Sequence, residues 1–330
     1  MEKKNILVTG AGGFLGLEVV KRLIKDGHQV YGLARNIYPE VESLGVDFIA
    51  CDLSLKEEVT KLNLSHIDAI IHTAAMAGVW GDKDKFHAIN YNGTVHLVDK
   101  CIEEGIQTFI YTSSPSVVFG KDDILNGDES LPYPKKYYTE YAKSKAQAEA
   151  YVLNKAEDIS IDFNAVSLRP HLIWGPGDPH LIPRVLSQAK KGRLKVVGDG
   201  NNLVDIIHVS NAAMAHTQAL YKLLEDKSIS ARSYFIGQEE PVKLWDFIDN
   251  VLRHKGLDPI ESSISFTTAY RVGLFLELVF KFLGILKPEP PMTRFVAMQL
   301  AKSHYFSHKN AEADFGYIPK ITTEEGIKTL

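Results

Sequence analysis

Three tyrosine–lysine pairs with i,i+4 spacing could perform proton-transfer chemistry in this chain of 330 residues. On a helix, this spacing places the ammonium one turn from the phenol, where it can stabilise a phenolate and hold a cofactor ribose. The pairs are Tyr141/Lys145, Tyr151/Lys155 and Tyr305/Lys309. Tyr151 would face away from Tyr141 on the same helix, and Tyr305 lies far along the chain. We select Tyr141 and Lys145, near a predicted helix start, with Ser114 from the end of the preceding strand.

These three residues suit hydride transfer to a carbonyl carbon. As hydride arrives, negative charge grows on the carbonyl oxygen and a positioned acid must protonate it. An isolated tyrosine has a pKa of about 10, and both Lys145 and an oxidised nicotinamide ring would lower it. Ser114 would orient the carbonyl and hold the developing oxyanion, although a strand-end cap is the structural alternative for this serine.

A glycine-rich turn follows the first predicted strand and precedes a helix. In the segment TGAGGFLG, residues 9–16, Gly10 permits a tight turn, Gly13 lets a pyrophosphate approach and Gly16 allows close helix packing. The helix N-terminus, at Phe14 and Leu15, would attract the anion. The sequence therefore predicts a dinucleotide site here, with a purely structural turn as the alternative.

The ends of the next two strands indicate which dinucleotide binds. Enzymes that use NAD carry an acid about 20 residues after the turn, where it binds the ribose 2′-hydroxyl. This chain has Arg35 in that region and no carboxylate at residues 32–36, so we expect NADP(H) to be preferred and NAD(H) to remain usable. A solvated loop arginine is the alternative for Arg35. Asp52 and Leu53 are predicted to contact the adenine, unless Asp52 is only a helix N-cap.

The elements that must position these residues alternate between strands and helices. The predicted strands are Asn5–Thr9, Gln29–Leu33, Asp47–Ala50, Ala69–His72, Phe109–Ser113 and Asn164–Leu168, separated by amphipathic segments such as 18–25 and 94–104. This order is typical of an α/β fold with a Rossmann-type, doubly wound parallel sheet. We expect residues 1–174 to form the dinucleotide-binding domain. Residues 175–330 should form mainly a smaller C-terminal substrate lobe, with some segments returning to the Rossmann domain.

Composition argues against several classes of protein. The 37 Lys and Arg residues are balanced by 41 Asp and Glu, so a globally basic nucleic-acid binder is not expected, and no local basic cluster changes this. Two cysteines, Cys51 and Cys101, cannot build a disulfide framework, and the first residues lack the apolar run of a secretory signal. We expect a cytoplasmic protein that needs no metal ion.

Together these residues resemble the extended short-chain dehydrogenase/reductase family, over nearly the whole chain. The resemblance rests on the Gly10/Gly13/Gly16 turn, Asp52, residues 90–94 (NYNGT), Ser114, Tyr141, Lys145, residues 168–170 (LRP) and residues 175–178 (GPGD). It implies that Ala74 and Ala75 line the cofactor, that Asn90 supports the fourth strand, and that Pro170 and His171 lie beside the nicotinamide. It also implies a substrate-covering lobe from about residue 175 and a homodimer. Asn211 departs from the family, in which many members carry Asp.

Within that family, the chain is similar to the 3β-hydroxysteroid dehydrogenase branch and most similar to the 2-alkyl-3-oxoalkanoate reductases of bacterial head-to-head olefin biosynthesis. Segments 77–81, 111–119, 169–180, 202–205 and 289–295 carry this similarity. It implies NADPH-dependent reduction of an apolar, long-chain 2-alkyl-3-oxo acid to the 3-hydroxy acid, with Tyr141 as general acid. The alternative is NAD-dependent oxidation of a 3β-hydroxysteroid or 4-carboxysterol. A binding protein without catalysis and a sugar-nucleotide epimerase fit less well.

An oxo acid also needs a partner for its carboxylate. His171 is the first choice, and Arg184 and Arg294 are further candidates, although each could be an ordinary surface or capping group. Trp80 and Trp174 could line the substrate pocket, or could simply be core.

The segment Ala269–Leu286 is the most apolar in the chain, and on a helix its charged residues share one arc. Its three internal charges argue against a spanning helix. We expect either a packed core or dimer surface, a lid over alkyl chains, or shallow insertion into a membrane surface; docking with pathway enzymes is a further option. Pro288, Pro290 and Pro291 should end this helix, with a second one starting at Met292.

Overall fold

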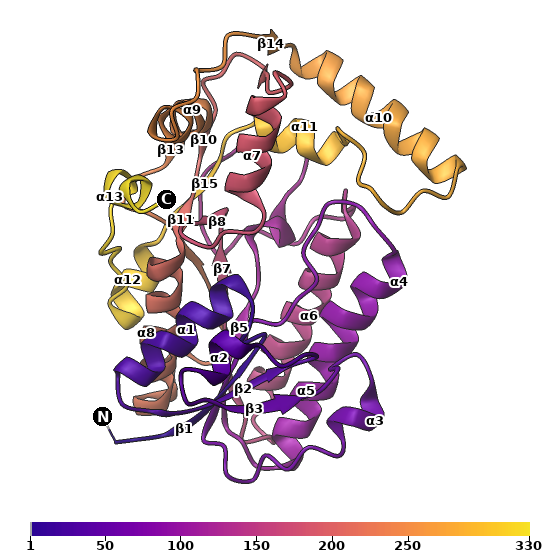
Figure 1. Cartoon of the computed structure of the whole chain (residues 1–330). Coiled ribbons are helices and arrows are strands. Elements are labelled where there is room, and N and C mark those ends of the chain that lie inside the picture. Colours follow the sequence, from indigo (N-terminus) through magenta and orange to yellow (C-terminus); the bar gives the residue numbers. More distant parts are fainter. Residues whose placement is uncertain (1) are drawn as a thin grey trace.

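A seven-stranded parallel sheet forms the centre of the computed structural model, which describes residues 2–330 (Figure 1). Its strands lie in the order β12-β7-β5-β4-β1-β2-β3. They are β1 Asn5–Thr9, β2 Gln29–Ala34, β3 Asp47–Ala50, β4 Ala69–His72, β5 Thr108–Thr112, β7 Asn164–Pro170 and β12 Arg232–Ile236. The order reverses between β1 and β4, where ligands of such sheets bind at the carboxyl ends of the strands. The predicted doubly wound α/β fold is confirmed, and the six predicted strands shift by no more than two residues.

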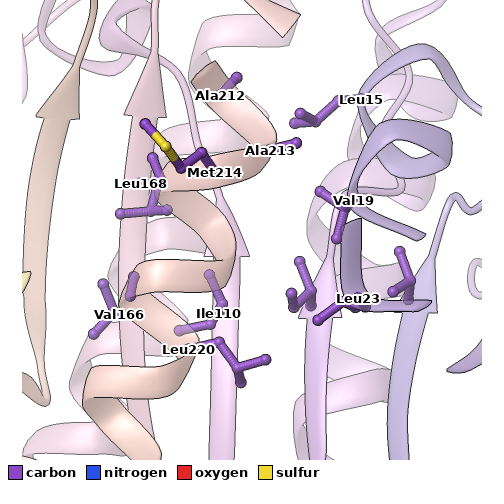
Figure 2. Packing of buried hydrophobic residues seen from close by; sticks show 14 of the residues in the cluster. Leu15, Val19, Leu23, Ile110, Val166, Leu168, Ala212, Ala213, Met214 and Leu220 are labelled. Carbon is purple, nitrogen blue, oxygen red and sulfur yellow. The ribbon is translucent and has the colours of Figure 1, made fainter. Parts of the chain in front are cut away.

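Helices cover both faces of this sheet because each has one apolar side. On one face lie α1 (Phe14–Lys25) and α8 (Val209–Glu225), which pack against each other. Helix α8 lies over the strand residues Ile110, Val166 and Leu168, and α1 lies over β1 and β2 (Figure 2). The other face carries α3 (Lys56–Val59), α5 (Gly93–Glu103) and α6 (Glu140–Glu157).

Segments after residue 175 contribute to both parts of the molecule. Strand β12 joins the large sheet and α8 packs against α1, so these two belong to the Rossmann body. A separate apolar cluster around Trp174, Trp245 and Phe247 forms the core of the lobe. The further elements include α2 Pro39–Glu42, α4 Lys83–Phe86, β6 Ile124–Gly127, β8 Ile173–Trp174, α7 Leu181–Lys190, β9 Val196–Val197, β10 Leu203–Val204, β11 Ile207–His208, β13 Val242–Lys243, α9 Leu244–His254, β14 Ser263–Ile264, β15 His304–Phe306, α12 Lys309–Phe315 and α13 Thr323–Lys328.

The apolar segment of the lobe forms helix α10 (Phe266–Phe282), which lies along the upper edge of the molecule in Figure 1. The predicted end at residue 286 is wrong, because Gly284 adopts a left-handed conformation (φ 66°) just beyond the helix. The next helix, α11, runs over Arg294–Ala301 rather than from Met292, since the Thr293 hydroxyl accepts a hydrogen bond from Val296 N and caps it. None of the helices in residues 2–330 is both long and apolar enough to cross a bilayer.

Candidate active site

Ser114, Tyr141 and Lys145 converge beyond the carboxyl end of β5. Lys145 and Tyr141 lie on the first two turns of α6, which begins where the Thr139 hydroxyl accepts a hydrogen bond from Ala142 N. The Lys145 ammonium donates a hydrogen bond of 2.5 Å to the Thr112 carbonyl and lies 4.1 Å above the centre of the Tyr111 ring. Two residues after Thr112, Ser114 begins a short 3-10 turn and accepts hydrogen bonds from the Ser116 amide and hydroxyl. The strand-end cap expected as the alternative for Ser114 is therefore present, and its role toward a substrate oxygen stays a prediction.

Burial changes the acidity of both helix residues. It raises the pKa of Tyr141, and the neighbouring Ser114 hydroxyl opposes this rise. Burial lowers the pKa of Lys145 to about 7, and the charge of Glu149, one turn further along α6, opposes this fall. The site can thus hold a protonated phenol beside an amine that titrates near neutral pH.

The other two tyrosine–lysine pairs lie elsewhere. Tyr151 donates a hydrogen bond of 2.5 Å to Asp99 on α5, and the Lys155 ammonium lies 5.5 Å from the Tyr151 ring. Tyr305 belongs to β15 in the small four-stranded sheet. Of the three pairs, the one selected from sequence context is the one whose tyrosine lies beside Ser114.

Asn90 ties the segment after β4 to helix α6. Its side-chain oxygen accepts a hydrogen bond from Met76 N, and its amide donates to Met76 O and to the Ser144 hydroxyl. Residues 90–94 lie where α4 has run into a π-helical turn at His87–Asn92 that continues as α5. Such turns insert an extra residue into a helix and are common at functional sites. Here the turn carries Asn90.

The glycine turn has the close contacts that a phosphate-binding loop requires. Gly10 has φ 68°, and a Cβ added there would lie 2.9 Å from Ala74 N. A Cβ at Gly16 would lie 2.1 Å from the Gly10 carbonyl oxygen. Gly13 donates to that same oxygen and is the last residue before α1. The turn therefore brings the helix N-terminus against the end of β4, beside Ala74 and the exposed Ala75.

The sheet edge that would receive the adenosine half carries exposed Arg35 at the end of β2. Asp52 does not cap α3; its carboxylate accepts hydrogen bonds from the Ser54 amide and hydroxyl. The Leu53 side chain is buried in the core, so any cofactor contact falls to its backbone. The sequence analysis did not single out Tyr38, whose ring packs directly on the glycine turn. A Cβ added at Gly12 would lie 2.2 Å from this ring.

A buried polar chain that the sequence analysis also missed joins the ends of β1 and β4. The His72 ring contacts the Thr9 hydroxyl at 2.6 Å and the Thr94 hydroxyl at 3.0 Å. Thr94 in turn donates to the Asn90 carbonyl. Burial, together with the charge of Lys145, lowers the pKa of His72 to about 3, so the ring is neutral. Alternating apolar patterns give no signal for such a chain, because it forms only when neighbouring strands pair.

A second missed group locks α6 to β7. Fully buried Glu149 accepts hydrogen bonds from Arg169 Nε at 3.0 Å and Nη2 at 2.6 Å, from Ser167 at 2.7 Å and from Tyr133 at 2.7 Å. Arg169 and its hydrogen bonds lower the pKa of this carboxyl despite its burial. The pair fixes the helix that carries Tyr141 and Lys145 against the strand that ends at Pro170.

His171 cannot serve as the predicted cationic partner of a carboxylate in this structure. It is buried, and its Nε2 lies 2.7 Å from Nδ1 of His304. Burial and the neighbouring His304 push the pKa of His171 well below its ordinary value, so the ring is neutral. The edge of the Phe119 ring closes over both histidines.

The remaining predicted substrate residues differ in exposure. Trp174 is fully buried beside Phe247 and His208, so its assignment as a pocket wall is wrong and it is core. Trp80 is partly exposed, and its indole donates to the Ile285 carbonyl at 3.0 Å. Arg184 and Arg294 are both paired, with Glu289 and Glu277 respectively.

Asn211, the departure from the family pattern, has a structural role. Its amide donates to Gln238 and to the Ile321 carbonyl, while its oxygen accepts from Lys320 N and Ile321 N. An aspartate could accept the last two hydrogen bonds but could not donate the first two. Asn211 therefore fastens the C-terminal segment to α8.

Comparison with known proteins assigns the chain to a family. Residues 7–267 match the model of the 3-beta hydroxysteroid dehydrogenase/isomerase family. The 2-alkyl-3-oxoalkanoate reductase of Shewanella oneidensis is 42% identical over 98% of this chain and 84% of its own length. The enzyme of the same name from Stenotrophomonas maltophilia is 40% identical over 98% of both chains.

More distant matches agree with this assignment. The sterol-4-alpha-carboxylate 3-dehydrogenase, decarboxylating, of Mus musculus is 31% identical over 98% of this chain and 89% of its own length. Among solved structures, UDP-glucose 4-epimerase of Thermus thermophilus in complex with NAD has a TM-score of 0.74 at 24% identity, covering 98% of this chain and 97% of the other, which shows the shared fold. The chain is an NAD(P)-dependent oxidoreductase, and it belongs to the 3-beta hydroxysteroid dehydrogenase/isomerase family of extended short-chain dehydrogenases/reductases.

Proposed function

We propose that this enzyme reduces a long-chain 2-alkyl-3-oxoalkanoate to the 2-alkyl-3-hydroxyalkanoate with NADPH, and that Tyr141 is the general acid. The observation that carries the proposal is the convergence of Ser114, Tyr141 and Lys145 beside the glycine turn, in a chain whose relatives at 40–42% identity are named as reductases of such acids.

The residues around the glycine turn fit a dinucleotide. A side chain at Gly16 would collide with the turn itself, and one at Gly10 would collide with the segment that follows β4. The first amides of α1 have no partners within the helix. Exposed Arg35 can bind a 2′-phosphate, and no carboxylate at residues 32–36 repels it. When bound, NADPH would supply the hydride.

The protein's own residues hold and move the proton. Tyr141 keeps its hydroxyl proton at neutral pH because burial raises its pKa, and it donates that proton as the substrate oxygen gains charge. Ser114 stabilises the same oxygen, and Lys145 favours the phenolate that remains. The hydrogen bonds of Asn90 and Glu149 hold α6, and with it Tyr141 and Lys145, in position during the proton transfer.

Oxidation of a 4-carboxysterol with NAD is the second candidate, because a relative at 31% identity is named for a sterol-4-alpha-carboxylate. Both substrates carry a carboxylate on the carbon next to the reacting C–O carbon, so the same site could process either. The two candidate substrates differ in carbon skeleton, since one has long alkyl chains and the other is a sterol. The two reactions also differ in cofactor.

A substrate panel separates the two candidates. NADPH or NADH oxidation is followed with 2-alkyl-3-oxo acids of increasing chain length, and NAD or NADP reduction with 3β-hydroxysteroids and a 4-carboxysterol. We expect kcat/KM to be highest for a long-chain oxo acid with NADPH, and Arg35→Ala to lose most of the preference for NADPH over NADH. Faster turnover of the sterols with NAD, unchanged in Arg35→Ala, would overturn the proposal.

A further inference from the structure

The outward face of helix α10 concentrates exposed apolar side chains. Of the fourteen large apolar side chains that are exposed in residues 2–330, seven fall within residues 272–286. Three of them follow one stripe of the helix: Phe275 is 64% exposed, Leu278 58% and Phe282 90%. Isolated exposed apolar residues are ordinary, whereas a continuous stripe of this kind marks a binding surface.

The inward face of α10 is fixed, so the stripe cannot turn toward the substrate as a lid. Ala269, Gly273 and Glu277 share this inward side and are buried. A Cβ at Gly273 would lie 2.5 Å from the carbonyl carbon of Thr293, and Glu277 accepts hydrogen bonds from the Arg294 amide and guanidinium at 2.7–2.9 Å. Rotating the helix would break the Glu277–Arg294 pair and expose its charges to an apolar surface.

The charges around the stripe are mostly positive. Glu277 is neutralised by Arg294, and Glu289 by Arg184 at 3.2 Å. Arg271, Lys281 and Lys287 are exposed, and none of them lies within ion-pair distance of a carboxylate in residues 2–330. An apolar stripe with a cationic border is complementary to an anionic lipid surface. Two copies of this face in a symmetric dimer would instead bring their cations together.

The helix that carries the stripe contacts the segment after β4 through Trp80. The Trp80 indole donates to the Ile285 carbonyl, its ring packs edge-on against Phe280 with centroids 6.1 Å apart, and the Lys281 ammonium lies 5.9 Å from the same ring. Trp80 belongs to the segment that leaves β4 after Ala74 and Met76, the latter held by Asn90. A surface bound to α10 therefore lies next to the segment that contains Met76 and Trp80.

We propose that the outward face of α10, centred on Phe275, Leu278 and Phe282, docks the enzyme on an anionic lipid bilayer. The apolar side chains enter the boundary between headgroups and acyl chains, and Arg271, Lys281 and Lys287 contact the headgroup phosphates. The inference depends on this helix surface and does not depend on the proposed substrate.

Vesicle binding of the full chain tests the proposal. The protein is sedimented with phosphatidylcholine vesicles that contain a quarter phosphatidylglycerol, and with pure phosphatidylcholine vesicles. We expect preferential binding to the anionic vesicles that weakens with salt. The triple variant Phe275→Ser/Leu278→Ser/Phe282→Ser should lose roughly tenfold or more in partition coefficient. The matched control Leu125→Ser/Ile159→Ser, which removes equally exposed apolar side chains elsewhere, should bind like the parent.

Tryptophan fluorescence gives a second measurement. Trp174 and Trp245 are 0% and 4% exposed, so a blue shift on adding anionic vesicles reports on Trp80, next to α10. Because these assays contain no substrate, their result is independent of the substrate panel, and circular dichroism checks that the triple variant is folded. Absence of vesicle binding by the parent, or equal binding by the triple variant, would overturn the proposal. If the parent does not bind vesicles and the triple variant converts a dimer to a monomer, the outward face of α10 is instead an interface between two copies of the chain.

Discussion

At the scale of single residues, the proposed site contains a phenol and an amine whose acidities are set by burial. Tyr141 keeps its proton because the pKa of its hydroxyl is raised, whereas Lys145 titrates at about pH 7 because its ammonium is buried. Perturbed values of this kind are typical of catalytic groups. Both side chains can be tested through the rate of reduction.

Replacing Tyr141 by Phe removes the proposed acid and leaves the ring. We expect kcat for oxo-acid reduction to fall by about 10²–10⁴-fold, the usual contribution of general acid catalysis, while the dissociation constant of NADPH stays within about twofold. Turnover is measured from NADPH absorbance and affinity from fluorescence titration. Tyr151→Phe, in the second tyrosine–lysine pair, is the matched control and should retain full activity. Equal losses in both variants would contradict the assignment.

Reduction should lose efficiency as the pH rises. A lysine whose pKa is lowered to about 7 loses its ammonium above that pH, while Tyr141 keeps its proton because its pKa is raised. We therefore expect kcat/KM, which reports groups of the free enzyme, to fall about tenfold per unit above pH 7. The profile is measured from pH 5.5 to 9.5 with one buffer system of constant ionic strength. A flat profile up to pH 9 would show that Lys145 stays charged.

At the scale of elements, the site depends on joints between helices and strand ends. The glycine turn joins α1 to β4, Asn90 joins the π-helical turn to α6, and the Glu149–Arg169 pair joins α6 to β7. Each joint can be weakened without touching the proposed catalytic residues.

Gly16→Ala tests the first joint. The added methyl would lie 2.1 Å from the Gly10 carbonyl oxygen, so the turn must open and its amides move. We expect NADPH affinity to fall by about tenfold or more with the fold retained. Gly120→Ala is the control, because a Cβ at that position meets nothing within 4 Å. Isothermal titration measures both, and unchanged affinity in Gly16→Ala would place the phosphate elsewhere.

Glu149→Gln tests the joint between α6 and β7. It leaves the buried Arg169 guanidinium without its charge partner, which typically costs about 3–5 kcal/mol in unfolding free energy. The double variant Glu149→Gln/Arg169→Met should recover much of this loss, since it removes the unpaired charge. Urea unfolding followed by circular dichroism gives both values. A single variant as stable as the parent would mean that the pair contributes little.

At the scale of the whole molecule, several buried histidines make the fold sensitive to acid. Burial lowers the pKa of His72 to about 3 and of His216 to about 4, and it lowers the pKa of His304 as well. His216 lies between the Thr112 hydroxyl at 2.8 Å and the Ala212 carbonyl at 2.7 Å. In the unfolded chain these rings regain an ordinary pKa of about 6.5 and bind protons that the folded protein does not.

Stability should accordingly be complete above pH 6.5 and fall as the pH drops toward 4. Each buried histidine contributes a loss of up to about 1.4 kcal/mol per pH unit within that window. His216→Gln should reduce this slope, and His66→Gln, at an exposed position, should leave it unchanged. Urea unfolding at pH 8, 6 and 5 measures the slopes. A slope that His216→Gln does not alter would show that His216 is already protonated in the folded protein.

Local sequence determined much of the Rossmann body. Apolar runs, glycine spacing and helix caps act over a few residues, so the strands of the large sheet from β1 to β7, the glycine turn and the start of α6 could be predicted from the amino-acid sequence alone. The context of Tyr141 also separated it from Tyr151 and Tyr305. These features are predictable because period and spacing in the chain translate directly into backbone geometry.

Only the tertiary structure decided which side chains became buried partners. His171 was the expected partner of a carboxylate, yet it pairs with His304 from 133 residues away. Arg294 forms an ion pair with Glu277, and Trp174 is buried in the core. Long-range pairing depends on which faces meet when the helices and sheets pack, and no period in the sequence records that. The sequence by itself thus indicated the strands and helices and the residues proposed for proton transfer. Packing decided which charged side chains became paired, and it left the apolar face of α10 exposed.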